Sequence, residues 1–330
     1  MVIQLQILFT QKHSGEAVIC ELIKGENMKV SVVMTTYNGI RFLKEMLDSL
    51  KNQTRKIDEV IICDDRSTDN TVKFINEYIE VYNLKNWKIT VNHQNLGWEK
   101  NFLNALNSAN NDIIYPCDQD DVWHLDKIEK MTAAFEKNDN IWLLSSGFHS
   151  FCENGGIPEI QNPVPTETAE IVSRVVFNEK YYQILRPGCT MAFKKELLPL
   201  FVKNWKPGTP HDAVLWTIAA LLRKLYIYDD TLIEYRRHDS NASNEIIHGY
   251  KYRVNAINRT IIINNWYLNS EYFDENKLQI VQNCTNWCDY RYKLIVEKKP
   301  FYWFKLFRYR KYYLNLRKYF GDIYYFFKSK

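Results

Sequence analysis

Short apolar runs alternate with amphipathic stretches over the first 125 residues of the chain. Runs rich in β-branched and other apolar residues predict buried strands over residues 30–34, 59–63, 87–91 and 113–115. Between them, apolar side chains recur at helical spacing and predict helices over residues 42–50, 70–82 and 98–107. This alternation predicts an α/β fold with a mainly parallel sheet and helices on both faces.

Polar loops follow three of these strands, at residues 35–38, 64–65 and 118–121. The carboxyl ends of parallel strands meet at one edge of a sheet, where ligands bind. The first loop offers hydroxyls, an aromatic ring and an amide, which suit a nucleotide base. Asp65 can accept a hydrogen bond from a ribose hydroxyl or a base N–H. The pattern therefore predicts one ligand site at this edge.

The third loop carries three carboxylates, those of Asp118, Asp120 and Asp121, within four residues. Such carboxylates repel one another unless a positive charge lies among them, and a hard divalent cation, Mg²⁺ or Mn²⁺, supplies it. Asp118 and Asp120 can converge on the ion while Gln119 points elsewhere. The alternative is a solvated acidic turn or a helix N-terminus. Because the three polar loops share one sheet edge, we favour the metal site.

Composition narrows the class of protein. With 330 residues and 46% hydrophobic positions, the chain suits one large domain or two smaller ones. A net charge of +4 is too small to indicate a nucleic-acid partner. Seven cysteines without a C-x-x-C pair argue against a disulfide framework or zinc site and favour the cytosol. Neither a dinucleotide fingerprint nor a P-loop occurs, and no apolar run is long enough to span a bilayer.

The same patterns predict the domain organisation. Residues 1–27 make a poor signal peptide, so we expect an extension outside the core, with an extra edge strand as the alternative. We expect a catalytic domain over residues 28–245, with a nucleotide-binding half at 28–125 and an acceptor half at 126–245. Residues 246–330 are expected to form a helical, basic and aromatic C-terminal region.

Four motifs, taken together, resemble those of the family 2 glycosyltransferases, which are inverting enzymes with the GT-A fold. They occur in the family's order and approximate spacing, at residues 30–39, 63–71, 95–97 and 118–123. The last reads Asp-Gln-Asp-Asp-Val-Trp and is most similar to the rhamnosyltransferase-like, polysaccharide-assembly branch. The resemblance extends over residues 28 to about 240.

The resemblance implies a nucleotide-sugar donor and assigns its contacts. The residues it places at the nucleotide are Thr35, Tyr37, Asn38, Asp65 and Lys100 (or Asn101). The residues it places at the metal and diphosphate are Asp118, Asp120, His238 and Arg236 (or Arg237), with Asp120 the more direct metal ligand. It also places Gly188, on a glycine-containing strand, beside the sugar pocket.

Asp212 matches the family's catalytic base and opens an apolar helical stretch. Inverting transfer needs one carboxylate to deprotonate the acceptor hydroxyl, and partial burial raises the proton affinity of such a group. The simpler interpretation is an N-cap aspartate, and both roles can coexist.

The tail, from residue 298 onward, interleaves basic and aromatic residues. This pattern predicts contact with a membrane surface. A helical hairpin that packs on the catalytic domain is the alternative. Nucleic-acid stacking uses the same residue types, but nothing else in the sequence supports it.

The sequence therefore predicts an inverting glycosyltransferase that uses dTDP-rhamnose or a UDP-hexose. Its acceptor is a hydroxyl of a glycan or a lipid-linked molecule in cell-surface polysaccharide synthesis. The expected location is the cytoplasm, peripheral to the inner face of the membrane. The alternatives are a non-catalytic sugar-binding partner and a nucleotidyltransferase. The latter would carry a glycine-rich basic loop after the first strand, which residues 35–39 do not form.

Overall fold

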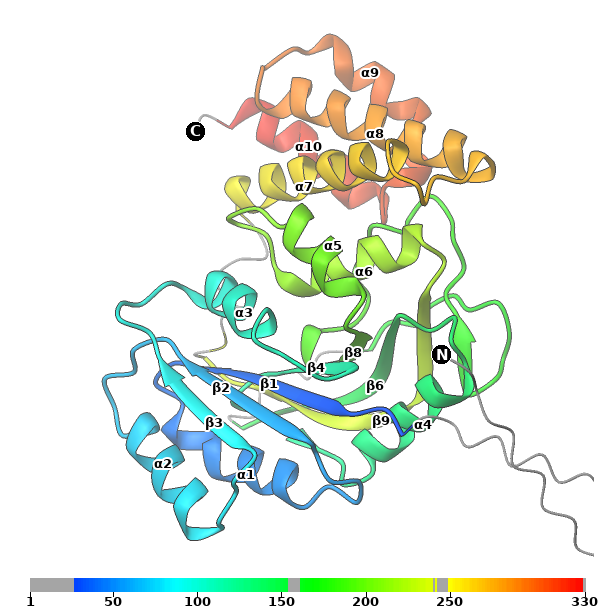
Figure 1. The fold of residues 1–330 in the computed structure, drawn as a ribbon. Coiled ribbons are helices and arrows are strands. Elements are labelled where there is room, and N and C mark those ends of the chain that lie inside the picture. Colours follow the sequence, from blue (N-terminus) through cyan, green and yellow to red (C-terminus); the bar gives the residue numbers. More distant parts are fainter. Residues whose placement is uncertain (1–26, 154–160, 240, 242–248, 329–330) are drawn as a thin grey trace, which may run out of the picture.

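The computed structural model describes residues 27–153, 161–239, 241 and 249–328 (Figure 1). The predicted extension at residues 1–27 lies outside the described residues, apart from Asn27. One mixed sheet forms the base of the molecule. Helices cover both of its faces, and a further helical layer lies beyond one of them (Figure 1).

The first half of the sheet is parallel, with strand order β3-β2-β1-β4. Its strands are β1 (Val30–Thr36), β2 (Glu59–Asp64), β3 (Trp87–Val91) and β4 (Ile113–Cys117). The helices between them are α1 (Ile40–Lys51), α2 (Thr71–Val81) and α3 (Trp98–Leu106). The four predicted strands and three predicted helices are therefore confirmed. The strands could be predicted because buried parallel strands appear in a sequence as nearly continuous apolar runs.

The second half of the sheet is mixed. Here β8 (Met191–Lys194) lies antiparallel between β4 and β6 (Leu143–Cys152), and β6 runs parallel to β9 (Leu225–Arg237). Two short strands, β5 (Val122–Trp123) and β7 (Val172–Arg174), pair antiparallel with β9. The α/β class with a mainly parallel sheet is confirmed. The acidic loop leads into β5, and α4 (Lys127–Lys137) begins only later, so the loop is not a helix N-terminus.

Two apolar layers hold the sheet and its helices together. On one face α1, α2 and α4 bury side chains such as Leu43 and Ile128 against the sheet. On the other face lie α3, α5 (Leu197–Asn204) and α6 (His211–Leu221). Ten of the eleven residues of α6 are buried, because the sheet and the C-terminal helices enclose it from opposite sides (Figure 1). This explains why its sequence is apolar almost all round.

The C-terminal region is helical, as predicted. It comprises α7 (Tyr250–Leu268), α8 (Glu275–Ile295), α9 (Phe301–Arg308), the 3₁₀ turn η2 (Arg310–Tyr312) and α10 (Leu316–Phe327). Of these helices, α7 packs on α5 and α6, and α8 packs on α7, so the region packs on the catalytic domain as the hairpin alternative anticipated (Figure 1). None of the helices in the described residues is both long enough and apolar enough to cross a bilayer.

One buried carboxylate joins three segments of this region. Asp322 on α10 is fully buried and accepts hydrogen bonds from Arg291 Nε at 2.7 Å and Arg291 Nη2 at 3.2 Å. It also accepts one from the Tyr313 hydroxyl at 2.6 Å and pairs with Arg253 on α7. Satisfying a buried charge in this way stabilises the packing of α10 against α7 and α8.

Candidate active site

The strand register brings the polar loops together. Thr36 on β1 lies opposite Asp64 on β2, and Met34 lies opposite Cys117 on β4. Asp64 is fully buried and accepts hydrogen bonds from the Thr36 hydroxyl at 2.7 Å and from the Ser67 amide at 2.7 Å. Its carboxylate therefore shapes the first two loops instead of facing the open edge.

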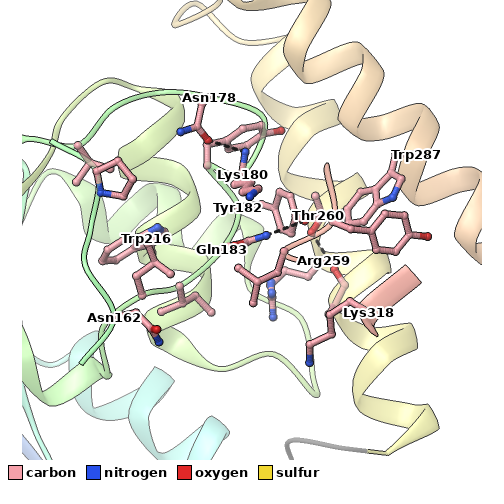
Figure 2. Close-up of a pocket in the computed structure, with 18 of the residues that line it drawn as sticks. Asn162, Asn178, Lys180, Tyr182, Gln183, Trp216, Arg259, Thr260, Trp287 and Lys318 are labelled. Carbon is pink, nitrogen blue, oxygen red and sulfur yellow. Dashed lines mark hydrogen bonds between the residues drawn. The ribbon is translucent and has the colours of Figure 1, made fainter. Parts of the chain in front are cut away.

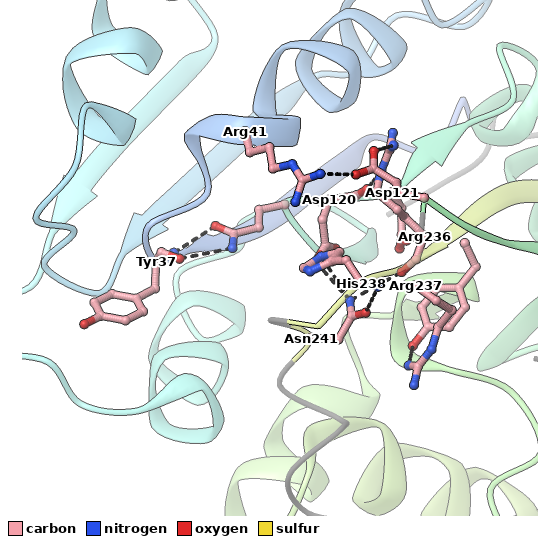
Figure 3. Close-up of polar contacts among 11 residues, drawn as sticks. Tyr37, Arg41, Asp120, Asp121, Arg236, Arg237, His238 and Asn241 are labelled. Carbon is pink, nitrogen blue, oxygen red and sulfur yellow. Dashed lines mark hydrogen bonds and ion pairs between the residues drawn. The ribbon is translucent and has the colours of Figure 1, made fainter. Parts of the chain in front are cut away.

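Gln119 ties the first loop to the acidic loop. Its Oε1 accepts from the Tyr37 amide at 2.9 Å, and its Nε2 donates to the Tyr37 carbonyl at 3.1 Å (Figure 3). A Cβ at Gly39 would lie 2.1 Å from Gln119 Oε1, so a side chain there would displace Gln119 from this position. As expected, Gln119 points away from the carboxylates on either side of it. The Tyr37 ring is 47% exposed at the edge of the sheet.

Asn38 and Thr35 complete the first loop. Asn38 has a φ of 47°, a left-handed conformation that asparagine tolerates well. Its amide donates to Ser67 Oγ at 2.8 Å, and its Oδ1 accepts from the Thr68 amide at 2.8 Å. Thr35 is buried at the end of β1. The first loop is thus fixed by its contacts with residues 67–68 and 119.

Asp65 holds the turn at residues 95–97 in place. Its carboxylate accepts from the Leu96 amide at 2.8 Å, the Gly97 amide at 2.9 Å and Asn92 Nδ2 at 2.8 Å. Sequence reasoning missed this anchoring role. A carboxylate offers about four acceptor positions, so little capacity is left for a nucleotide. Lys100 is exposed on the α3 helix that follows the turn.

Asp120 and His238 form a pair at the edge of the sheet. Asp120 Oδ2 lies 2.9 Å from His238 Nε2 and 3.3 Å from Asn241 Nδ2 (Figure 3). The imidazole packs on the Phe42 ring, with centroids 4.6 Å apart. The structure therefore brings together two of the three predicted metal ligands from positions 118 residues apart.

Asp118 and Asp121 lie beside Cys189. One ligand atom from each of the three residues lies within 4.8 Å of the others. Asp121 is fully buried; its Oδ1 accepts from the Arg236 amide at 3.0 Å, and its Oδ2 has no partner among the described residues. Burial raises the pKa of both carboxyls, and the neighbouring carboxylates raise it further. Burial and the same carboxylates also raise the pKa of the Cys189 thiol well above its usual range, so the thiol stays protonated.

These residues fit a divalent cation. The carboxylates of Asp118 and Asp121 lie together, and Asp120 is near enough for its charge to act on both. Asp121 Oδ2 lacks a partner among the described residues, and an imidazole lies next to Asp120. Carboxylate oxygens with one imidazole suit Mn²⁺ or Mg²⁺, whereas the soft sulfur of a cysteine is a poor ligand for these hard ions. The chemistry of the donor set therefore favours Asp118, Asp120 and His238 as ligands over the set that includes Cys189.

A buried lysine lies beneath the acidic group, and sequence reasoning missed it. Lys127 is fully buried, its Nζ donates to the Cys189 carbonyl at 2.6 Å, and it lies 3.8 Å from the Trp123 ring centroid. Burial lowers the pKa of Lys127 to about 7, while the nearby acidic groups act to raise it. The signal was its helical spacing with Met131 and Phe135, which places it on the buried face of α4.

Asp212 lies in the first turn of α6, and Gly188 lies against it. The helix begins at His211 after the N-cap residue Pro210, so the N-cap interpretation of Asp212 is wrong. Gly188 lies in the 3₁₀ turn η1 (Gly188–Thr190) before β8, and not on the predicted strand. A Cβ there would lie 2.5 Å from His211 Nε2 and 3.3 Å from the Asp212 Cβ. Asp212 also acts to raise the pKa of Asp118, so it lies near the acidic group.

His211 fills the space behind Asp212. Its ring is buried and stacks on Phe102 with centroids 4.0 Å apart, and neither ring nitrogen has a partner among the described residues. Burial lowers the pKa of His211, so the ring is neutral near pH 7.

Arg236 is held by protein groups. It is 4% exposed, ion-pairs with Glu153 at 2.6 Å and with Glu45, and donates from Nε to the Asp120 carbonyl at 2.8 Å. Phe42 and Phe151 flank the guanidinium, each with a centroid 4.7 Å away. This side chain therefore fixes the acidic loop in the structure, and its charge is offset by two carboxylates.

Comparison with known proteins now decides the family. Residues 31–199 match the family model described as "Glycosyl transferase family 2". The chain belongs to this family. The predicted resemblance is thereby confirmed.

Related proteins support the assignment. The dTDP-rhamnosyl transferase RfbG of Shigella flexneri is 30% identical over 246 residues, which cover 71% of this chain and 80% of that protein. The Bacillus subtilis protein named "Putative glycosyltransferase EpsE" is 34% identical over 127 residues, 38% of this chain and 45% of that protein. The chain thus matches less than half of the length of EpsE.

Solved structures of glycosyltransferases share the GT-A fold. The crystal structure of Staphylococcus aureus TarS residues 1–349 with UDP-GlcNAc has a TM-score of 0.60 at 20% identity, covering 90% of this chain and 79% of that chain. The mannosyltransferase PcManGT of Pyrobaculum calidifontis, in complex with GDP-Man and Mn²⁺, has a TM-score of 0.50 at 15% identity, covering 79% and 70%. Both comparisons support the predicted fold.

Proposed function

We propose that this family 2 glycosyltransferase moves one sugar from a nucleotide-diphosphate donor to an acceptor hydroxyl, with inversion at the anomeric carbon. One observation carries the proposal: Asp212 opens α6 next to Gly188 and close to the acidic group at residues 118–121. A carboxylate so placed can take the proton of an acceptor hydroxyl as its oxygen attacks. The bond to the diphosphate breaks on the opposite side of the sugar, which inverts the centre.

The first loop and the acidic loop hold the donor in this proposal. Thr35, Tyr37 and Asn38 bind the base, with the exposed Tyr37 ring available for stacking. Asp65 acts chiefly by fixing the turn at residues 95–97, which carries exposed Lys100 toward the nucleotide. Arg236 positions the acidic loop and does not contact the diphosphate.

Asp118, Asp120 and His238 would hold Mg²⁺ or Mn²⁺. When bound, the ion neutralises negative charge on the departing diphosphate. Gly188 keeps the approach to Asp212 free of a side chain, since any Cβ would collide with His211.

The donor and the acceptor class are part of the same proposal. Similarity to a dTDP-rhamnosyl transferase favours dTDP-rhamnose, and the fold shared with a UDP-GlcNAc complex keeps a UDP-hexose as the alternative. The acceptor is a glycan or a lipid-linked molecule of the cell surface. Six cysteines in the described part of the chain are free thiols, which supports a reducing, cytoplasmic location.

A thermal-shift screen tests the donor site. We expect one of UDP, dTDP, GDP and CMP to raise the Tm in the presence of Mn²⁺, because a ligand at 100 times its Kd stabilises the folded state by about 2.7 kcal/mol. Asp120→Asn should abolish the Mn²⁺-dependent part of this shift. Asp139→Asn, a change at a side chain that is 93% exposed, should retain it. Stabilisation by no nucleotide, or an unchanged shift with excess EDTA, would contradict the donor or the metal assignment respectively.

The outer face of the C-terminal helices is suited to a membrane surface. Phe301, Phe304 and Phe307 are 64%, 74% and 57% exposed at i, i+3 spacing on α9. On α10 the exposed residues at helical spacing are Leu316, Phe320, Tyr324 and Phe327. Asp322, the sole acidic residue between positions 301 and 328, is buried, whereas exposed cations flank the aromatic side chains. Such a face favours an anionic lipid surface.

Vesicle co-sedimentation measures this contact. The protein should bind vesicles of mixed phosphatidylglycerol and phosphatidylcholine, and less so at high salt because screening weakens the charge attraction. Phe304→Ser combined with Phe320→Ser should lower partitioning about ten-fold or more, since each buried phenyl group contributes about 1.5–3 kcal/mol. Val81→Ser, at a 74% exposed position on α2, serves as the control. Equal binding by all three proteins would refute the proposed face.

A further inference from the structure

A cavity lies on the far side of α6 from the sheet, between the loop at residues 162–185 and the C-terminal helices (Figure 2). Its volume is about 610 Å³, within the range of pockets that hold small molecules. Side chains from α6, α7, α8 and α10 line it, together with the loop. None of the residues assigned above to the donor or the metal belongs to this pocket.

The charged side chains that line this pocket are all cationic. Five cationic residues line it, and among the described lining residues none is Asp or Glu. The cations are Lys180, Arg253, Arg259, Arg291 and Lys318. The buried carboxylate of Asp322 behind the wall pairs with Arg253 and Arg291, which leaves the group with an excess of positive charge.

Arg259 is a buried cation in the wall of this pocket. Only 6% of it is exposed, its buried Nε has no hydrogen-bond partner, and it forms no ion pair within the described part of the chain. Burial lowers the pKa of its guanidinium, while Tyr252 and Asp212 act in the opposite direction. Leaving a buried charge without a partner costs several kcal/mol. An anion that enters the pocket would remove that cost.

The pocket adjoins the proposed catalytic base. Trp216, in its wall, is four residues beyond Asp212 on α6 and so lies one helical turn away on the same side. Tyr252 and Arg259, also in the wall, are close enough to Asp212 to interact with its charge. A molecule anchored here can therefore extend toward the carboxylate that deprotonates the acceptor.

We propose that this pocket binds a phosphate group of the acceptor, with Arg259 as its anchor and Lys318 at its rim. The inference rests on the proposed function and adds to it that the acceptor is phosphorylated. Guanidinium groups form strong charge-assisted hydrogen bonds with phosphate. Leu314 and Lys318 of the pocket wall belong to the segment that carries exposed Leu316 and Phe320, so the pocket adjoins the proposed membrane face. The phosphate belongs either to a lipid carrier or to a polyol or glycan phosphate.

Binding of inorganic phosphate, measured by Tm shift without metal, tests the pocket. The wild-type chain should show a saturable rise in Tm. In Arg259→Met the apparent affinity should fall about ten-fold or more, because a hydrogen bond to a charged group is lost. Arg259→Lys and Lys318→Gln should show intermediate losses. Arg308→Gln removes an exposed charge on α9 outside the pocket and should bind phosphate like the wild type.

Each variant is also tested with the stabilising nucleotide and Mn²⁺. An unchanged nucleotide shift in Arg259→Met shows that the fold and the donor site persist, so a lost phosphate shift is then assigned to the pocket. If the nucleotide shift is absent from the wild type, the proposed function fails, and the phosphate result still decides whether this is an anion site. Phosphate binding of equal strength in Arg259→Met and wild type, or absent from the wild type, would overturn the inference.

Two further probes identify the source of the phosphate. Tighter binding of farnesyl phosphate than of glycerol 3-phosphate supports a lipid carrier. The reverse order supports a polyol or glycan phosphate. Binding of neither compound would overturn the assignment to an acceptor.

Discussion

Replacing Asp212 by Asn is expected to lower the rate of sugar transfer by about 10²–10⁴-fold, the usual contribution of a general base. The amide cannot accept the proton of the acceptor hydroxyl. It retains the shape of the carboxylate and an oxygen that can accept from the Ala213 amide, a contact of 2.6 Å in the structure. The loss should therefore appear in kcat, with little change in nucleotide affinity or Tm.

The measurement is single-turnover transfer to a saturating acceptor, with nucleotide binding followed separately. Glu196→Gln, an exposed carboxylate before α5, provides a charge-matched control and should transfer at the wild-type rate. Full turnover by Asp212→Asn would remove this residue from the reaction and return it to a structural role at the start of α6.

The second large effect is on stability. Asp322→Asn should lower the free energy of unfolding by about 3–5 kcal/mol, because it leaves Arg291 and Arg253 without their shared counter-charge in a buried site. Asp289→Asn on α8 removes a partly exposed ion pair to Lys293 at 2.6 Å, and should cost less than about 1 kcal/mol. Urea titrations followed by tryptophan fluorescence compare the two. Equal losses would show that the buried carboxylate has no special part in holding α10.

The pH dependence of this difference has a defined sign. Burial acts to raise the pKa of Asp322, but Arg291 and Arg253 hold it below its usual range. As pH falls, the unfolded chain therefore binds the proton before the folded chain does. The stabilisation is complete above the unfolded pKa of about 3.9 and is lost as pH falls through the folded value. The gap between wild type and Asp322→Asn should thus be constant near neutral pH and narrow below about pH 4.

The sequence predicts the first half of the fold well because β1, β2, β3 and β4 are buried parallel strands joined by regular helices. The resemblance implies a strand at Gly188, but β8 begins only at Met191, because its four residues take their place from antiparallel pairing with β4 and β6, each distant along the chain. The two residues of β5 carry no pattern of their own either. Such elements depend on long-range pairing, which local periodicity does not record.

The candidate site was likewise predictable from the sequence only in part. That Thr35, Asp65 and Asp120 would lie on one edge follows from strand ends alone. Strand ends do not show which of these groups already form hydrogen bonds or ion pairs with other protein groups. Asp65 is bound by three N–H donors, and Arg236 by Glu45 and Glu153, two residues on unrelated segments. A sequence shows the residue types at a site, whereas the spare bonding capacity of each depends on tertiary contacts.

Because α6 is enclosed on both sides, the GT-A portion and the C-terminal helices depend on each other. This helix carries Asp212 and has an apolar surface almost all round, and the C-terminal helices cover the side that faces away from the sheet. A chain shortened at residue 245 would present that surface to water and would be prone to self-association. We therefore expect the GT-A portion and the C-terminal helices to be inherited together and not exchanged separately by recombination. Changes in acceptor preference are expected to accumulate by substitution around the cavity wall instead.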